Sequence, residues 1–145
     1  MSTVIAVTNQ KGGVGKTTTS SALCGVFAQR GKKTLAIDLD PQGNLTFSLG
    51  AVDNKNTIHD VLKGDISIEE AIQQTKNGDV IASNILLSGS ELELTSVGRE
   101  YILKERLESV LDKYDYIILD TPPALSILTI NAYTAANDLI IPMTP

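Results

Sequence analysis

A glycine- and lysine-rich stretch near the N-terminus, QKGGVGKTT over residues 10–18, carries residue types suited to binding phosphate. Glycines lack a Cβ, so consecutive backbone N–H groups can turn inward around phosphate oxygens. In such a loop we expect Lys16 to neutralise the β- and γ-phosphates, the Thr17 hydroxyl to bind Mg²⁺, and Thr18 to reach the α-phosphate region. The alternative is a glycine-rich turn with two solvated lysines, but such turns rarely carry the complete pattern.

The stretch departs from the strict P-loop pattern G-x-x-x-x-G-K-[ST] at one position. Gln10 stands where that pattern has its first glycine, and a second lysine, Lys11, lies at the start of the loop. The apolar run before the loop and the helical spacing after it supply the strand–loop–helix context that a P-loop needs. The following helix is therefore expected to point its positive end toward the phosphates.

Three aspartates stand at the ends of apolar runs that have the character of buried strands. Asp38 and Asp40 follow the run 34–37, and Asp120 ends the run 116–119. In open α/β sheets, ligands bind outside the carboxyl ends of the strands, so these carboxylates are expected beside the phosphate loop. One such carboxylate can orient an attacking water, and another can hold the hydration shell of Mg²⁺, as in the Walker B pattern of four apolar residues and an acid. A solvated acidic turn is the alternative for the first two aspartates.

Alternating strand and helix patterns must position these groups. Short apolar runs rich in β-branched residues predict strands, and apolar residues at helical spacing predict helices. Near-continuous apolar strands separated by helices favour an α/β fold with a doubly wound, mainly parallel sheet that has helices on both faces. The predicted strands cover 4–7, 34–37, 85–87, 116–119 and 139–141, and the predicted helices cover 17–30, 57–63, 67–75, 97–113 and 126–136.

Composition narrows the class of protein. The 145 residues suit one domain, and the 42% apolar and 20% charged shares are ordinary for a globular domain. The apolar runs are too short to span a bilayer, and the N-terminus does not have the pattern of a secretory signal. The net charge of −5 and the lack of a Lys/Arg cluster make this chain by itself a poor nucleic-acid binder. Cys24 is expected to be a small buried hydrophobe and His59 to lie at the surface.

The stretch KGGVGKTT at 11–18 resembles the deviant Walker A motif of the ParA/MinD family of P-loop ATPases. Two further segments, IDLDPQGN at 37–44 and YIILDTPP at 116–123, are similar to the Soj branch of ParA-type partition ATPases. The similarity runs from Thr3 to Pro142. It implies a P-loop NTPase fold, Mg²⁺-dependent binding and hydrolysis of ATP, and a role in the partition of plasmid or chromosomal DNA.

The same resemblance implies roles for individual residues. Lys11 corresponds to the signature lysine, which reaches the phosphates of the partner subunit in an ATP-sandwich dimer. Asp40 would orient the hydrolytic water. The implied catalytic residues are Lys11, Lys16 and Asp40; the nucleotide-binding residues are Lys11, Gly12, Gly13, Val14, Gly15, Lys16, Thr17 and Thr18; and the Mg²⁺ residues are Thr17, Asp38 and Asp120.

Partners and location follow from the resemblance as well. It implies a homodimer, a ParB-like activating protein, non-specific DNA binding through a further C-terminal part, and a cytoplasmic, nucleoid-associated location without membrane attachment. Chains of that family continue past the fifth strand, so residues 1–145 are expected to be a single P-loop ATPase domain that is truncated there. Two alternatives stay open: a nucleotide-dependent dimerisation and DNA-binding switch with little turnover, and a MinD-like positioning ATPase.

Overall fold

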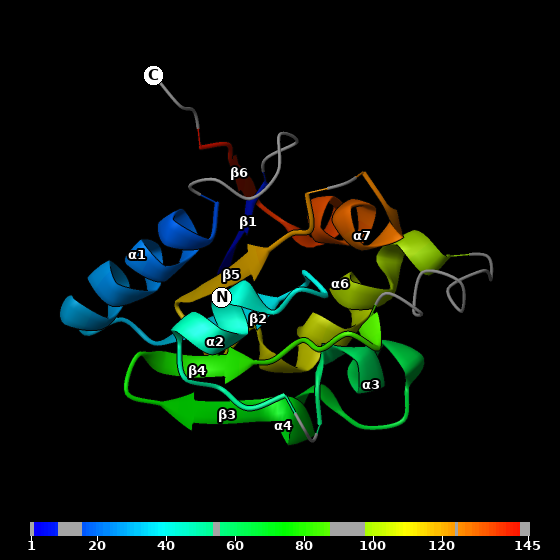
Figure 1. Cartoon of the computed structure of the whole chain (residues 1–145), viewed down its shortest axis with the longest axis horizontal. Helices are drawn as coiled ribbons and strands as arrows, with labels where there is room; N and C mark the ends of the chain where they lie inside the picture. The colour runs from blue at the N-terminus through cyan, green and yellow to red at the C-terminus, as the bar shows by residue number, and fades with distance from the viewer. Residues whose placement is uncertain (1, 9–15, 54–55, 88–97, 124, 143–145) are drawn as a thin grey trace.

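The computed structural model describes residues 2–8, 16–53, 56–87, 98–123 and 125–142 (Figure 1). Within these residues the chain forms one central sheet of six strands. The strands are β1 (Thr3–Val7), β2 (Thr34–Asp38), β3 (Ile72–Thr75), β4 (Gly78–Ile81), β5 (Tyr116–Asp120) and β6 (Asp138–Ile140). They lie in the order β3-β4-β2-β5-β1-β6, and every neighbouring pair is parallel except β3 and β4.

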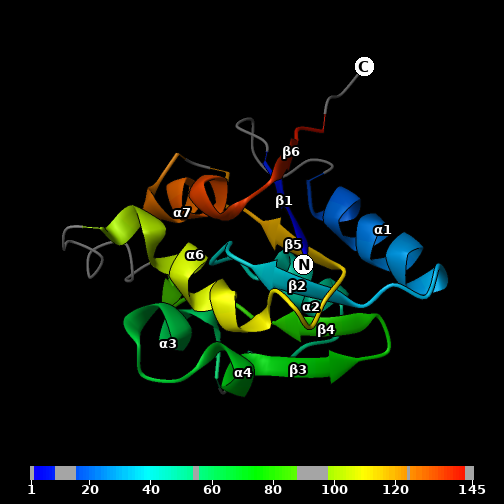
Figure 2. The same ribbon diagram turned by 180° about the vertical axis from the view of Figure 1, so that it is seen from behind.

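Helices cover both faces of this sheet, and two opposite views show α1 on one side of the strands and α6 and α7 on the other (Figure 1, Figure 2). The first face carries α1 (Lys16–Gln29) and α2 (Asn44–Ser48). The second face carries α3 (Ile58–Lys63), α4 (Ile68–Ala71), α6 (Ile102–Leu107) and α7 (Ile127–Ala135), with the 3-10 turns η1 (Arg99–Tyr101) and η2 (Glu108–Val110) on either side of α6. The predicted doubly wound, mainly parallel α/β fold is confirmed. Within the described residues, none of the helices has the length and apolar character needed to cross a membrane.

The central strands are apolar throughout because their residues alternate between two hydrophobic clusters. In β1, Val4 and Ala6 pack on the face covered by α3 and α7, whereas Ile5 and Val7 pack on the face covered by α1 and α2. The residues of β2 and β5 alternate in the same way. A parallel sheet that is covered on both sides requires such strands. The polar side chains of β1, β2 and β5 therefore lie at the ends of these strands.

The predicted helix over 67–75 is correct only in its first half. Ser67 caps α4 as expected, but the chain then continues as β3 and pairs with β4 in an antiparallel hairpin. The side chain of Gln73 exchanges two hydrogen bonds with the backbone of Val52, at 3.0 and 2.7 Å, and these bonds hold the segment at the sheet edge. Thr75 closes the hairpin by donating its hydroxyl to the carbonyl oxygen at the start of β4, at 2.7 Å.

The predicted strand over 85–87 is wrong, because the strand in this region is β4 and ends earlier. Ile85 and Leu86 are 68% and 60% exposed. The Oδ1 of Asn84 accepts the N–H of Leu86 at 3.0 Å, and its carbonyl accepts the N–H of Leu87 at 3.0 Å. Asparagine side chains that bond the backbone two residues on stabilise turns at the expense of extended pairing.

The prediction for Cys24 is confirmed, whereas the prediction for His59 is wrong. Cys24 is buried between α1 and the sheet, as predicted, and burial, followed by the negative charge of Asp120, raises the pKa of its thiol to about 11. His59 was expected at the surface but is 7% exposed. It lies in α3, and its helix packs closely enough against the sheet to bury positions that polarity alone would assign to solvent.

Candidate functional site

The carboxyl ends of three adjacent strands bring two aspartates side by side. In the register of the sheet, Asp120 at the end of β5 pairs with Asp38 at the end of β2 on one side and with Val7 of β1 on the other. Both aspartates are completely buried. Two negative charges held side by side away from water repel each other, so this position favours a proton or a cation.

Asp38 organises the loop that follows β2. Its Oδ1 accepts the N–H of Asp40 at 3.0 Å, and its Oδ2 accepts the N–H and the hydroxyl of Thr46 at 2.8 and 2.7 Å. Burial, and next the charge of Asp120, raises the pKa of Asp38 to about 6, although the bonds from Thr46 and Asp40 act in the opposite direction. A carboxylate offers about four acceptor positions, so Asp38 keeps about one for a further donor.

Asp120 is held from the face covered by α1. Ser20, which is buried in that helix, donates its hydroxyl to Asp120 Oδ1 at 2.8 Å. The carbonyl of Asp120 also accepts the N–H of Leu39 at 2.8 Å, which extends the pairing of β2 and β5 by one residue. These bonds fix the first turns of α1 relative to the ends of both strands.

Asp40 lies two residues beyond the end of β2 and is 5% exposed. Its Oδ1 accepts the N–H of Gln42 at 3.0 Å. Its carbonyl oxygen accepts the N–H of Gly43 at 2.9 Å and the hydroxyl of Ser83 at 2.5 Å. The backbone and the carboxylate of Asp40 are thus both restrained at the carboxyl edge of the sheet.

The N-terminal end of the predicted phosphate loop is anchored at the same edge. Thr8, which follows β1, donates its N–H to the carbonyl of Ile140 at 3.0 Å and shares a hydrogen bond of 3.0 Å between its hydroxyl and that of Tyr133. Thr121, which follows β5, donates its N–H and its hydroxyl to the carbonyl of Val7 at 3.2 and 2.9 Å. Strands β1, β5 and β6 therefore end in one connected set of hydrogen bonds.

The C-terminal end of that loop is the start of α1. This helix of 14 residues begins at Lys16, and Thr18 in its first turn is exposed. Because Ser20 contacts Asp120, the positive N-terminal end of α1 lies beside the carboxyl edge of the sheet. The rest of the predicted nucleotide site lies outside the described residues, namely Lys11, Gly12, Gly13, Val14 and Gly15, together with the side chains of Lys16 and Thr17.

The carboxylates at this edge are a suitable donor set for a divalent cation that is held mainly through water. Within the described ranges, no three His, Cys, Asp or Glu side chains converge as a metal-binding group. Mg²⁺ at phosphate-transfer sites is usually held by one or two carboxylates together with waters and substrate phosphates. The opposed pair Asp38 and Asp120 matches that requirement in number and in charge.

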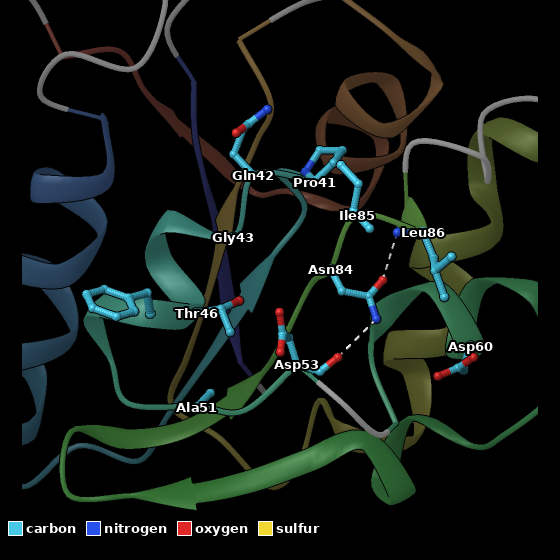
Figure 3. Close-up of a pocket in the computed structure, with 11 residues that line it drawn as sticks. Pro41, Gln42, Gly43, Thr46, Ala51, Asp53, Asp60, Asn84, Ile85 and Leu86 are labelled. Atoms are coloured by element: carbon cyan, nitrogen blue, oxygen red, sulfur yellow. Dashed lines mark hydrogen bonds between the residues drawn. The ribbon is translucent and has the colours of Figure 1, made fainter.

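A hollow of about 750 Å³ opens beside the aspartates (Figure 3). Its walls come from the loop after β2, from α2 and from the turn after β4. Figure 3 shows Asn84 spanning it, with Nδ2 donating to the carbonyl of Asp53 at 3.1 Å and Oδ1 accepting the N–H of Leu86. Thr46 is among the lining residues, but Asp38, Asp40 and Asp120 are not. The hollow therefore adjoins the aspartate edge rather than containing it.

Several polar residues of this edge were not predicted from the sequence, and Ser20, Thr46 and Ser83 are those that contact the aspartates or Asp40. Ser20 and Ser83 bond residues that are 100 and 43 positions away along the chain, so only the folded sheet brings them together. For Thr46 the sequence offered a weak indication of a role at the site, because this residue closely follows the segment 37–44. Serine and threonine are too common on surfaces for residue type alone to mark them.

Comparison with known proteins finds relatives along nearly the whole chain. A family model described as an AAA domain matches residues 2–145. The sporulation initiation inhibitor protein Soj of Bacillus subtilis is 48% identical over 99% of this chain, and the chromosome partitioning protein ParA of Caulobacter vibrioides is 42% identical over 97%. The chain spans 58% and 55% of the lengths of these two relatives.

Solved structures share the same fold. The crystal structure of cobyrinic acid a,c-diamide synthase from Mycobacterium smegmatis, with a bound ATP analogue and magnesium, matches with a TM-score of 0.94 and 44% sequence identity. The match covers 99% of this chain and 60% of that one. The architecture described above therefore occurs in a protein that holds a nucleotide and magnesium.

Ser20→Ala removes the hydroxyl whose hydrogen bond Asp120 accepts. The buried carboxylate then loses a charge-assisted donor, so the free energy of unfolding should fall by about 1.5–3 kcal/mol in urea denaturation followed by circular dichroism. Ser21→Ala, at the half-buried next position of α1, is the matched control and should change it by less than about 0.5 kcal/mol. Equal effects in the two variants would contradict the role assigned to the Ser20 hydroxyl.

Proposed function

The chain belongs to the family of ParA- and Soj-type P-loop ATPases with an AAA domain, and on this premise we propose that it binds ATP with Mg²⁺ and hydrolyses it. The observation that carries the proposal is the opposed pair of buried carboxylates, Asp38 and Asp120, beside the N-terminal end of α1. Anions are favoured at the N-terminal end of a helix, and cations are favoured beside paired carboxylates. The edge thus offers complementary positions for a phosphate chain and a divalent cation.

Phosphate binding is assigned to the loop 11–15 and the start of α1. The backbone N–H groups of the glycine-rich loop surround the phosphate oxygens, and Lys16 neutralises the β- and γ-phosphates. Thr18 contacts the α-phosphate region from the first turn of α1. Lys11 reaches the nucleotide held by a second copy of the chain.

Thr17, Asp38 and Asp120 are the residues assigned to Mg²⁺. Because Asp38 already uses three of about four acceptor positions within the protein, its contribution is indirect, through water. Ser20 keeps one oxygen of Asp120 oriented by its hydrogen bond. When bound, Mg²⁺ screens the negative charge that develops on the phosphoryl oxygens during transfer.

Asp40 is the residue assigned to the attacking water. Asp40 is 5% exposed at the edge of the sheet, and the N–H of Gln42 holds one oxygen of its carboxylate. By accepting a hydrogen bond from water, Asp40 directs the water oxygen at phosphorus, in line with the bond that breaks. The new P–O bond forms as the bond to the leaving group breaks, and the products are ADP and inorganic phosphate.

The role of the whole protein is proposed from its relatives, of which the chain spans 58% and 55%. These relatives are named as a sporulation initiation inhibitor and a chromosome partitioning protein, which supports a role in the partition of plasmid or chromosomal DNA. That role calls for an ATP-bound homodimer, a ParB-like activating protein and non-specific contacts with DNA, in the cytoplasm on the nucleoid.

Lys16→Ala removes the cation assigned to the β- and γ-phosphates. The affinity for ATP, measured by isothermal titration calorimetry with Mg²⁺ present, should fall by at least about 100-fold because a charge pair with phosphate is lost. Lys32→Ala changes an exposed lysine beyond the end of α1 and should bind ATP as the unmodified chain does. Unchanged ATP affinity in Lys16→Ala would exclude this loop as the phosphate site.

Asp40→Asn keeps the size of the side chain but removes its charge. The affinity for ATP should stay within about threefold, while kcat falls by about 100- to 10,000-fold, the usual contribution of a positioned base. Phosphate release is measured with ATP and Mg²⁺ and with no other phosphate acceptor than water, so that the released phosphate reports transfer to water.

Asp112→Asn is the control for that experiment, because Asp112 is exposed and lies beside the amino ends of the strands, with Thr34 and Gly78, at the edge of the sheet opposite to Asp40. It should leave both affinity and kcat unchanged. Full activity of Asp40→Asn would contradict the role of Asp40. A lack of phosphate release by the unmodified chain would contradict the proposed hydrolysis.

A further inference from the structure

A continuous network of buried hydrogen bonds encloses the loop between β2 and α2. Thr46 is at its centre, since its Oγ1 donates to Asp38 Oδ2 at 2.7 Å and accepts the N–H of Ser83 at 3.0 Å. Asp38 and Ser83 then hold the two backbone polar groups of Asp40: Asp38 Oδ1 accepts its N–H at 3.0 Å, and Ser83 Oγ donates to its carbonyl at 2.5 Å. All four residues are buried.

The network connects three elements that are separated in the chain. Asp38 ends β2, Thr46 lies in α2, and Ser83 follows β4. The N–H of Thr46 also donates to Asp38 Oδ2 at 2.8 Å, so the start of α2 is attached to β2 at two points. Figure 3 shows Thr46 on α2 beneath the loop residues Gln42 and Gly43. The loop therefore cannot shift without breaking contacts with both neighbouring elements.

We propose that Thr46 and Ser83 are positioning residues for Asp40, an inference that rests on the proposed role of Asp40 in orienting the attacking water. Asp38 holds the N–H of Asp40, Ser83 and the N–H of Gly43 hold its carbonyl, and the N–H of Gln42 holds one oxygen of its carboxylate. A shift of the Asp40 backbone would therefore leave buried polar groups unpaired and displace its carboxylate. A misplacement of about 1 Å at a reacting group costs about 100-fold in rate. The two hydroxyls thus act on hydrolysis through Asp40.

Three variants separate this role from a general contribution to stability. Thr46→Val keeps the shape of the side chain and removes the hydroxyl, Thr46→Ser keeps the hydroxyl, and Ser83→Ala removes the contact with the Asp40 carbonyl. In Thr46→Val and Ser83→Ala, kcat should fall about 10- to 100-fold, while KM for ATP stays within about threefold. Thr46→Ser should recover most of the lost kcat, because it restores both hydrogen bonds of the hydroxyl.

The decisive measurement repeats Thr46→Val in the Asp40→Asn background. If Thr46 acts through Asp40, the second substitution should lower the residual kcat by less than about threefold. An undiminished effect of Thr46→Val in that background, or wild-type kcat in Thr46→Val itself, would overturn the proposal. If Thr46→Val does not fold by circular dichroism, the same comparison with Ser83→Ala decides.

Failure of the proposed function gives a different result. A lack of phosphate release by the unmodified chain contradicts hydrolysis, and the catalytic part of the inference falls with it. Hydrogen exchange at the Asp40 amide tests the positioning without turnover: protection should fall in Thr46→Val and in Ser83→Ala and return in Thr46→Ser. Unchanged protection in the first two variants would overturn the positioning itself.

Discussion

Two buried carboxylates at the ends of neighbouring parallel strands are the constraint around which the rest of this molecule is arranged. Asp38 and Asp120 pair directly in the sheet, away from water and with like charge. Burial, and next the charge of Asp120, disfavours the ionised form of Asp38 and raises its pKa to about 6. The surrounding hydrogen bonds offset that cost: Ser20 from α1 and Thr46 from α2 donate to these carboxylates, so the helices on this face also stabilise the charges.

This arrangement links the stability of the chain to its proposed chemistry. An apolar pair at the same positions would favour folding more, because the strands on either side are apolar and packed on both faces. The negative charge of Asp38 and Asp120 favours binding of a divalent cation, because the cation relieves the repulsion between the two carboxylates. Strain of this kind at a functional site is a common compromise between stability and activity. The restrained loop around Asp40 then places a third carboxylate at the edge of the same charged region.

The sequence predicted the elements whose signals are local and strong. Buried strands such as β1 and β5, the helix α1, and the aspartates that end the strands were all found from apolar runs and motif spacing. The misses come from specific hydrogen bonds, some local and some long-range, that apolar patterns do not reveal. The helix expected over 67–75 gives way to a hairpin held by Gln73, and the run 85–87 becomes a turn because Asn84 bonds its own backbone neighbours. The role of Ser83 could not be predicted from the sequence, because its hydrogen-bond partner Asp40 lies 43 residues away along the chain.

The most direct test of the opposed carboxylates is the unfolding of Asp120→Asn with and without ATP and Mg²⁺. Without ligand, removing one of the two like charges should raise the free energy of unfolding by about 1–3 kcal/mol above that of the unmodified chain. Adding ATP and Mg²⁺ should stabilise the unmodified chain, through binding to its folded state, and leave the variant almost unchanged. A variant that is less stable without ligand, and that gains as much stability from ATP and Mg²⁺ as the unmodified chain, would contradict the central role of this pair.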